Sequence, residues 1–444
     1  MVSGVLLSLL LVADETPLTL DEALAKVEQA NPELLAARER AAAQEMRGEA
    51  AGRSRWPRLG LRSGWSRTDQ PSWVFANKLD AGEFAEDDFA IERLNAPASL
   101  SHLATALAVE APLDLFGKTG DQAASQRALG LVAEALAGEA RLEVRSRVVE
   151  AYRRTALARR AIEVTERALA GARARESDVE AGVAEGAALT ADLLRARARR
   201  RQREADLAER RGDAAVAGAA LARLLGAGPG VVFAPVDGTP EPAALTADEA
   251  DLAAEALAER PAVRAAEQRL EAARRSARGD ERASLPDLAA WAQVQDDRNS
   301  LSNGGQSYAV GAQLRWNAFD AGRGRRKAAA AADVRAAEQE SRAAADQVRL
   351  EVVTAFRRAL AARERHAAAI GGAEEGREAL RVVQERRRAG RATLTDELET
   401  EAASLAAELE ELRAAAEAAI ADASLERATG TNGHKGPETQ GNRE

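Results

Sequence analysis

The chain has 444 residues, of which 46% are hydrophobic but only 3% aromatic, so its composition favours closely packed alanine-rich helices over a thick aromatic core. Charged residues make up 30% of the chain and its net charge is −9, which argues against a nucleic-acid partner despite local arginine runs. The absence of cysteine excludes disulfides, thiolate metal ligands and a cysteine nucleophile.

Residues 1–13 are predicted to be a signal peptide. The apolar run over residues 5–13 is too short to span a bilayer, but it fits the apolar segment of a secretory signal. It departs from the usual pattern because no lysine or arginine precedes it. The sequence therefore indicates export.

An internal duplication follows. Four pairs of residues recur in matching surroundings, the first two pairs 229 positions apart and the last two 204 apart: Pro32 and Pro261, Pro57 and Pro286, Gly186 and Gly390, Gly226 and Gly430. The change of offset places about 25 extra residues in the first copy, in the segment 70–99 between two predicted strands.

Each copy has the same order of elements: two helices, two strands of alternating pattern, then a long helical hairpin. The first repeat is predicted at 14–228, with strands at 58–68 and 100–112 and a hairpin at 118–226. A proline-rich linker occupies 229–245. The second repeat is predicted at 246–430, with strands at 287–296 and 306–318 and a hairpin at 323–428, and 431–444 is predicted to be a disordered tail.

The hairpins are unusually long. The first helix runs from Lys118 to Gly186 without a proline, which corresponds to roughly 100 Å at about 1.5 Å per residue. Such rods indicate a coiled coil or a spanning structure. Each hairpin turns at a glycine, Gly186 or Gly390, followed by a Thr/Asp pair that can cap the next helix.

Enzyme motifs are incomplete in this sequence. Gly117-Lys118-Thr119 has the end of a phosphate-binding loop, but Pro112 stands where the first glycine is needed. Neither a Ser/His/Asp arrangement nor a metal-ligand spacing appears. The sequence predicts no catalytic residue, no cofactor and no metal.

The four strands present a topological problem. About eight strands are the practical minimum for a closed barrel, and an open sheet would expose its edges and one apolar face. Trimerisation would give twelve strands with the apolar faces in lipid, and Trp65, Tyr308 and Trp316 would then be membrane-interface anchors. The alternative is a small soluble sheet packed against the rods.

The chain resembles the TolC-type family of outer-membrane efflux proteins. The similarity lies in the duplicated order of elements and in motifs that recur in that order. These are the strand-end stretches 112–117 and 319–323, the two glycine turns, and Leu-Asn-x-Pro at 94–97. The fold class implied is mainly α with a small β part, a duplicated helix–strand–strand–long-helix unit whose trimer forms a 12-stranded membrane β-barrel continued by a periplasmic α-helical barrel.

The resemblance implies a passive channel in the outer membrane of a Gram-negative-type bacterium, serving a tripartite efflux or type I secretion system. The implied partners are two further copies of the chain, outer-membrane lipid, a periplasmic adaptor protein and an inner-membrane pump. The alternative functions are a soluble coiled-coil scaffold and the periplasmic adaptor itself. An adaptor would carry a single hairpin, whereas this chain carries two.

By the same resemblance the two turns are the periplasmic tips, where the adaptor docks and the pore closes. The docking residues would be Gly186, Leu189 and Thr190 in the first turn and Gly390, Thr393 and Leu394 in the second. Asp396 and Glu399 lie one turn apart on one helix face and are the predicted gate, with Asp192 as a weaker gate candidate. The simpler alternative is helix capping, favoured for Asp192. Arg386, Arg387, Arg388 and Arg391 are predicted to pair with carboxylates of a neighbouring subunit.

Overall fold

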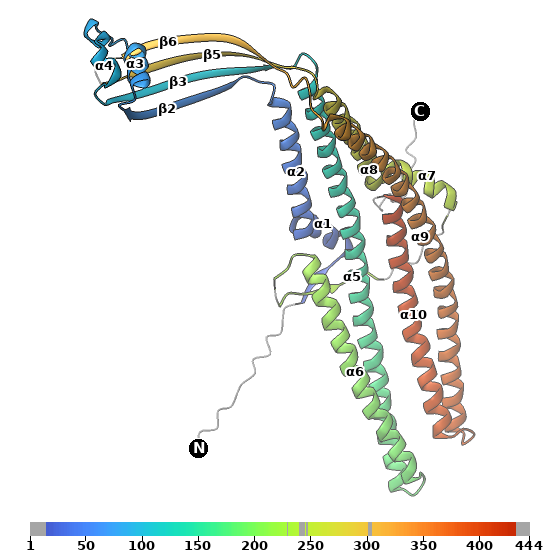
Figure 1. Ribbon diagram of the computed structural model, residues 1–444. Helices are drawn as coiled ribbons and strands as arrows, with labels where there is room; N and C mark the ends of the chain where they lie inside the picture. The colour runs from blue at the N-terminus through green and yellow to red at the C-terminus, as the bar shows by residue number, and fades with distance from the viewer. Residues whose placement is uncertain (1–14, 229, 239–244, 246, 301–303, 432–444) are drawn as a thin grey trace, which may run out of the picture. The chain divides into compact units, whose positions relative to one another are not determined.

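The computed structural model in Figure 1 describes residues 15–228, 230–238, 245, 247–300 and 304–431. The predicted signal peptide, most of the predicted tail and part of the predicted linker lie outside the described residues. The chain divides into two compact units. The helical unit comprises Met1–Ala41, Ala133–Ala266 and Ser341–Glu444, and the sheet unit comprises Ala42–Val132 and Glu267–Glu340.

Helices dominate the described chain, and the predicted fold class, mainly α with a small β part, is confirmed. The first half contains β1 (Glu15–Leu18), α1 (Leu20–Ala30), α2 (Pro32–Arg53), β2 (Arg58–Thr68), α3 (Pro71–Asp80), η1 (Glu86–Phe89), α4 (Ile91–Asn95), β3 (Leu100–Leu113), α5 (Lys118–Ala184) and α6 (Thr190–Leu224). The second half contains β4 (Val232–Pro235), α7 (Glu249–Glu259), α8 (Pro261–Arg282), β5 (Asp287–Arg298), β6 (Gly304–Arg315), α9 (Arg323–Arg388) and α10 (Leu394–Thr429). Within the described residues, none of these helices combines the length and apolarity needed to cross a bilayer.

Local sequence signals set the helix starts. Thr19 and Glu22 form a reciprocal capping box at α1, with the Thr19 backbone N–H 2.8 Å from the Glu22 carboxylate. Asp248 caps α7 through the Ala250 N–H at 3.3 Å. α2 and α8 both begin at a proline, a residue that costs nothing in the first turn because its missing N–H has no intrahelical partner there.

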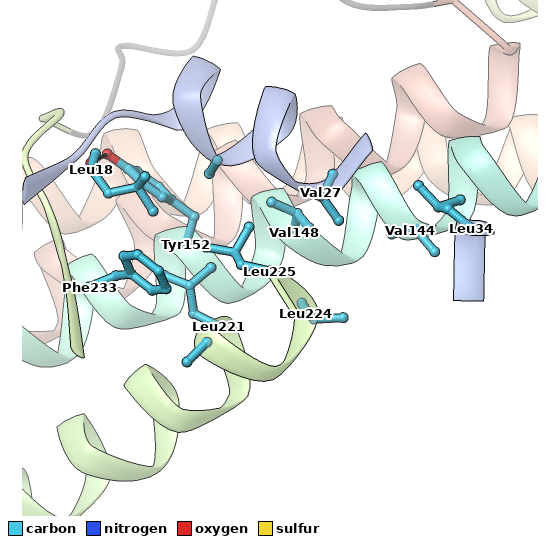
Figure 2. Close-up of a cluster of buried hydrophobic side chains, with 12 residues drawn as sticks. Leu18, Val27, Leu34, Val144, Val148, Tyr152, Leu221, Leu224, Leu225 and Phe233 are labelled. Atoms are coloured by element: carbon cyan, nitrogen blue, oxygen red, sulfur yellow. Dashed lines mark hydrogen bonds between the residues drawn. The ribbon is translucent and has the colours of Figure 1, made fainter. Parts of the chain in front are cut away.

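The core of the first repeat lies where α1 packs against α5 and α6 (Figure 2). Val27 of α1, Val148 and Tyr152 of α5, and Leu221 of α6 are buried together. The Tyr152 hydroxyl donates to the Leu18 carbonyl at 2.9 Å and lies 2.9 Å from the Asp237 carboxylate. Burial raises the pKa of Tyr152 to about 12. A second cluster, formed by α7 to α10, buries Ala256, Val263, Val348, Val352, Ala355, Ala359, Leu425 and Ala428.

A two-stranded parallel sheet, β1 with β4, completes the first core. Its register runs from Glu15 opposite Val232 to Leu18 opposite Pro235, and it places Phe233 in the cluster. Neither strand was predicted from the sequence. Four residues are too short for an alternating pattern to stand out, and β4 lies in the segment that its prolines marked as a linker.

The sheet unit contains a four-stranded sheet of order β2-β3-β5-β6, with all neighbours antiparallel (Figure 1). β2 and β6 are edge strands with no outer partner among the described residues. β6 ends at Arg315, whereas the alternation had predicted strand to residue 318. The reason is pairing: Arg315 lies opposite Asp287, the first residue of β5, so no neighbouring strand continues beyond it.

Because directly opposed residues share a face, the register sorts the side chains. The apolar face contains the row Leu61–Leu107–Val294–Tyr308 and the row Leu59–Val109–Ala292–Val310. The polar face contains Arg58, Arg62, His102, Glu110, Gln293, Gln295, Asp297, Gln313 and Arg315, together with Asp287, Trp291 and mostly small residues. On the apolar face Leu59, Leu61, Tyr308 and Val310 are all exposed.

The segment 70–99, which holds the extra residues of the first copy, is largely helical. It contains α3, η1 and α4, and it lies beyond the end of the sheet where β2 stops and β3 starts (Figure 1). Pro71 begins α3 at a favourable position, and aromatic contacts hold the short helices together.

Candidate functional site

The first hairpin tip joins α5 to α6. Gly186 has a φ of +71°, and the Ala187 and Ala188 N–H groups donate to the Gly182 carbonyl at 2.7 and 3.1 Å, which closes the end of α5. Leu189 is the N-cap of α6 and provides no side-chain hydrogen bond. The capping role favoured for Asp192 is therefore wrong: its carboxylate accepts from Arg195 at 3.0 Å instead.

The second tip, between α9 and α10, is capped. Gly390 has a φ of +70°, and Thr393 and Asp396 form a capping box. The Asp396 carboxylate accepts from the Thr393 N–H at 2.8 Å and from the Thr393 hydroxyl at 2.7 Å. These hydrogen bonds, the backbone one first, lower the pKa of Asp396. Glu399 is exposed and makes no contact of this kind with the described part of the chain.

The four arginines beside the second tip behave differently from one another. Arg387 forms an ion pair with Glu397 of the same chain. Arg386, Arg388 and Arg391 are exposed and have no ion pair with any described residue. Arg387 already has a carboxylate partner in its own chain. Pairing with a neighbouring subunit is therefore proposed only for Arg386, Arg388 and Arg391.

A buried ionic cluster close to the tips was missed by the sequence analysis. Arg175 of α5 contacts two carboxylates of α10, Glu397 at 3.1 Å and Glu401. All three side chains are largely withdrawn from solvent, and Arg387 completes the cluster from α9. We call Arg175, Arg387, Glu397 and Glu401 the tip cluster. Breaking one partner out of such a buried cluster costs about 3–5 kcal/mol, because the other charges stay buried.

An apolar contact lies beside the tip cluster. Val179 of α5 and Leu193 of α6 pack against Leu394 and Leu398 of α10. Arg199 of α6 also donates to the Leu398 carbonyl at 3.3 Å. The two hairpin tips are therefore joined within one chain by apolar packing, a buried ionic cluster and a hydrogen bond from a side chain to a backbone carbonyl.

Farther from the tips, a groove of about 1070 Å³ runs between the two hairpins. Its lining alternates apolar and charged groups drawn from α5, α6, α9 and α10, including Leu157, Arg210, Leu350, Arg358, Leu409 and Arg413. Such a mixed surface can accommodate solutes of several kinds without binding one of them strongly.

Of the three predicted interface aromatics, two lie at the ends of the apolar face and Tyr308 lies between them. Trp65 is in the row of Leu103 near the far end of the sheet, and Tyr308 is two rows nearer the helices. Trp316 directly follows β6 at the other end and donates to the Ser284 carbonyl at 3.1 Å. For strands tilted by about 40°, the distance along the barrel axis from Trp316 is about 20 Å to the row of Tyr308 and about 30 Å to the row of Trp65. The apolar band of outer-membrane barrels is about 25 Å tall, which lies between these two distances.

The chain belongs to the outer membrane efflux protein family, whose sequence profile matches residues 23–227 and 252–431. The class is an outer-membrane protein of efflux. The family generally implies a trimer and partner proteins. None of the curated proteins matches the sequence.

Solved structures agree on the fold. A membrane protein from Pseudomonas aeruginosa has a TM-score of 0.78 at 22% identity, covering 92% of this chain and 93% of that one. The outer membrane protein VceC of Vibrio cholerae has a TM-score of 0.75 at 21% identity, covering 93% and 96%. The CmeC outer membrane channel of Campylobacter jejuni has a TM-score of 0.77 at 16% identity, covering 93% and 85%.

Proposed function

We propose that three copies of this chain join their sheets into one 12-stranded barrel and form a passive, non-enzymatic conduit that closes at the hairpin tips. The observation that carries this is the sheet itself. Two unpaired edges and an exposed apolar face would be a liability in water, but edge-to-edge assembly in lipid removes both. The polar face then lines the pore.

The channel would close at the hairpin tips. Asp396 and Glu399 of each copy would form two rings of carboxylates, and Asp192 would add a third from the first hairpin. Rings of like charge favour cation entry. The tip cluster supports the closed arrangement, because separating the hairpins of one copy must break Arg175 away from Glu397 and Glu401. Arg386, Arg388 and Arg391 are free to pair between copies.

The partners follow from the same assembly. A periplasmic adaptor would dock on the two glycine turns through Gly186, Leu189 and Thr190 and through Gly390, Thr393 and Leu394, and would link the channel to an inner-membrane pump. Leu189 supports this role because it is exposed at the turn and caps nothing. Trp65, Tyr308 and Trp316 would anchor the barrel at the two lipid interfaces. The groove between the hairpins would form part of the conduit wall.

Planar-bilayer recording of the purified protein tests the conduit. A trimer on unheated gels that dissociates on heating, with discrete cation-selective channels, is the expected result. Neutralising the rings with Asp396→Asn and Glu399→Gln should reduce cation selectivity. Glu374→Gln, which neutralises an exposed carboxylate of α9 outside the groove, is the matched control. A protein that stays monomeric and gives no channels would overturn the proposal.

A further inference from the structure

Residues 69–99 form a small folded unit at the end of the sheet farthest from the helices, here called the distal cap (Figure 1). The Phe84 ring contacts Phe75 and Phe89 edge-on, with centroids 4.6 and 5.0 Å apart. Lys78 pairs with Asp88 at 2.7 Å, and Val74 is buried. The distal cap therefore has a core and an ion pair of its own.

The cap is fixed to the polar face of the sheet. A Cβ on Gly305 would lie 2.1 Å from the Asp80 carbonyl, so the end of α3 rests directly on β6 at a position where only glycine fits. Gly305 is opposite Asp297, on the polar face. The cap thus leans toward the side that would be the inside of the barrel.

A buried hydrogen-bond relay strengthens this attachment. Asn299 donates to the Asn77 carbonyl at 3.2 Å and to Glu83 at 3.0 Å, both in the cap. The side-chain oxygen of Asn299 faces His102 Nδ1 at 2.9 Å, and His102 Nε2 lies 3.0 Å from the Asp297 carboxylate. Since His102 and Asp297 are more than nine-tenths buried, the relay is a built connection between cap and strands.

The outer surface of the cap is apolar although nothing in the described chain covers it. Trp73, Leu79, Phe89 and Ile91 are each more than half exposed. Lipid is an unsuitable cover, because the cap carries seven acidic and two basic side chains and lies past the row of Trp65 and Leu103, the proposed outer lipid interface. Exposed apolar surface of this kind marks a contact with another protein surface.

We propose that the distal caps of three copies meet over the barrel mouth and form a second closure, distinct from the one at the tips, through Trp73, Leu79, Phe89 and Ile91. This rests on the proposed trimeric barrel. A barrel of about eight strands is filled by its own side chains, whereas about 16 leave an open channel, so a 12-stranded barrel has an intermediate opening that three inward-leaning caps can obstruct. The partner is thus a second copy of the same cap.

Cysteine cross-linking tests the contact, since the native sequence has no cysteine to interfere. Trp73→Cys and Ile91→Cys should each give a cross-linked dimer with a flexible bismaleimide in outer-membrane vesicles. Val310→Cys is the matched control, because Val310 is exposed to the same 71% as Ile91 but lies on the apolar face of the sheet. It should give none.

Conductance tests the closure. The triple variant Trp73→Ala, Leu79→Ala, Ile91→Ala and the single variant His102→Ala should each raise single-channel conductance about two-fold when the tips are held open by Arg175→Ala. Native protein that forms channels, with Ile91→Cys cross-linking no more than Val310→Cys and unchanged conductance, would overturn the cap contact alone. Native protein that forms neither trimers nor channels would overturn the proposed function and the closure with it.

Discussion

The two repeats bury equivalent positions with different side chains. The offsets of 229 and 204 pair Val27 with Ala256, Leu34 with Val263, Val144 with Val348, Val148 with Val352, Leu221 with Leu425 and Leu224 with Ala428, and all twelve are buried. The first repeat has the larger side chain in three pairs and adds Phe233 from β4. The backbone plan is thus shared, whereas core volume is adjusted locally.

The two repeats also use different side chains to satisfy the carbonyl groups at the end of the returning helix. Asn31 and Arg260 both precede the proline that starts the second helix of their repeat. Asn31 donates to the Leu224 carbonyl at 2.8 Å, and Arg260 donates to the Ala428 and Arg427 carbonyls at 2.8 and 3.2 Å. Each satisfies the open end of the helix that returns from the tip. Arg260 additionally binds Glu139 and Glu351.

The largest expected difference between the repeats lies at this pair. Arg260→Ala should destabilise the protein by about 3–5 kcal/mol, because two carboxylates lose a buried partner. Asn31→Ala should cost about 1–3 kcal/mol, the penalty for unsatisfied buried polar groups. Thermal unfolding of the detergent-solubilised protein, followed by circular dichroism, measures both. Arg264→Ala, an exposed arginine one turn along α8, is the control, and equal losses for Arg260→Ala and Asn31→Ala would contradict the comparison.

A second difference separates the tip cluster, which joins the two hairpins, from the ion pair at the first turn. Arg175→Ala removes a buried partner of two carboxylates and should weaken the closed arrangement by about 3–5 kcal/mol, so channel conductance should rise several-fold. Arg195→Ala breaks the exposed pair with Asp192, worth about 0–1 kcal/mol, and should leave conductance nearly unchanged. Bilayer recordings that show the reverse order would mean that the exposed Arg195–Asp192 pair, and not the tip cluster, holds the channel closed.

Tyr152 of the first repeat corresponds to Phe356 of the second, again 204 positions apart. A smaller loss of stability is expected from a substitution at this position. Tyr152→Phe makes the first repeat resemble the second and should cost about 0.5–1.5 kcal/mol, because the Leu18 carbonyl loses its hydroxyl donor. Burial raises the pKa of Tyr152 to about 12, above the about 10 of an unfolded tyrosine. Its contribution to stability is therefore complete below about pH 10 and is lost as the pH rises through 12.

Ultraviolet absorbance at high pH measures this ionisation. The chain has two tyrosines, so the difference between native protein and Tyr152→Phe isolates Tyr152. A difference signal that is complete by pH 10 would mean that the hydroxyl is open to solvent and would contradict the buried hydrogen bonds. The variant Tyr308→Phe, which alters the exposed tyrosine on the sheet, is the control.

Much of this architecture could be predicted because its signals are local or repeated. Alternating residues gave four strands, proline spacing gave the duplication, and glycine gave both turns. β1 and β4 could not be predicted, since each depends on a partner more than 200 residues away. α3 and α4 were missed because helices of ten and five residues depend on contacts such as Phe75 with Phe84 rather than on periodicity.

The tip cluster could not be predicted from the sequence, for a different reason. Glu397 and Glu401 lie four residues apart on one face of α10, which in a charge-rich helix is also the spacing of solvated residues. Their neighbours Leu394 and Leu398 follow the same spacing and are buried, and this was the available signal. Burial of a carboxylate depends on whether an arginine from another helix meets it, and that is a property of tertiary packing.

The smallest prediction concerns the missing cap of the first tip. Leu189 has the extended backbone of an N-cap, with φ −85° and ψ 146°, and Asp192 stands where Asp396 stands relative to Thr393. Leu189→Thr should therefore create a second capping box and stabilise the first turn of α6 by about 1 kcal/mol. Slower amide hydrogen exchange at residues 190–193 would report it. Leu189→Val has the same branched shape without the hydroxyl, so equal protection in Leu189→Val would show that the gain comes from shape and not from a cap.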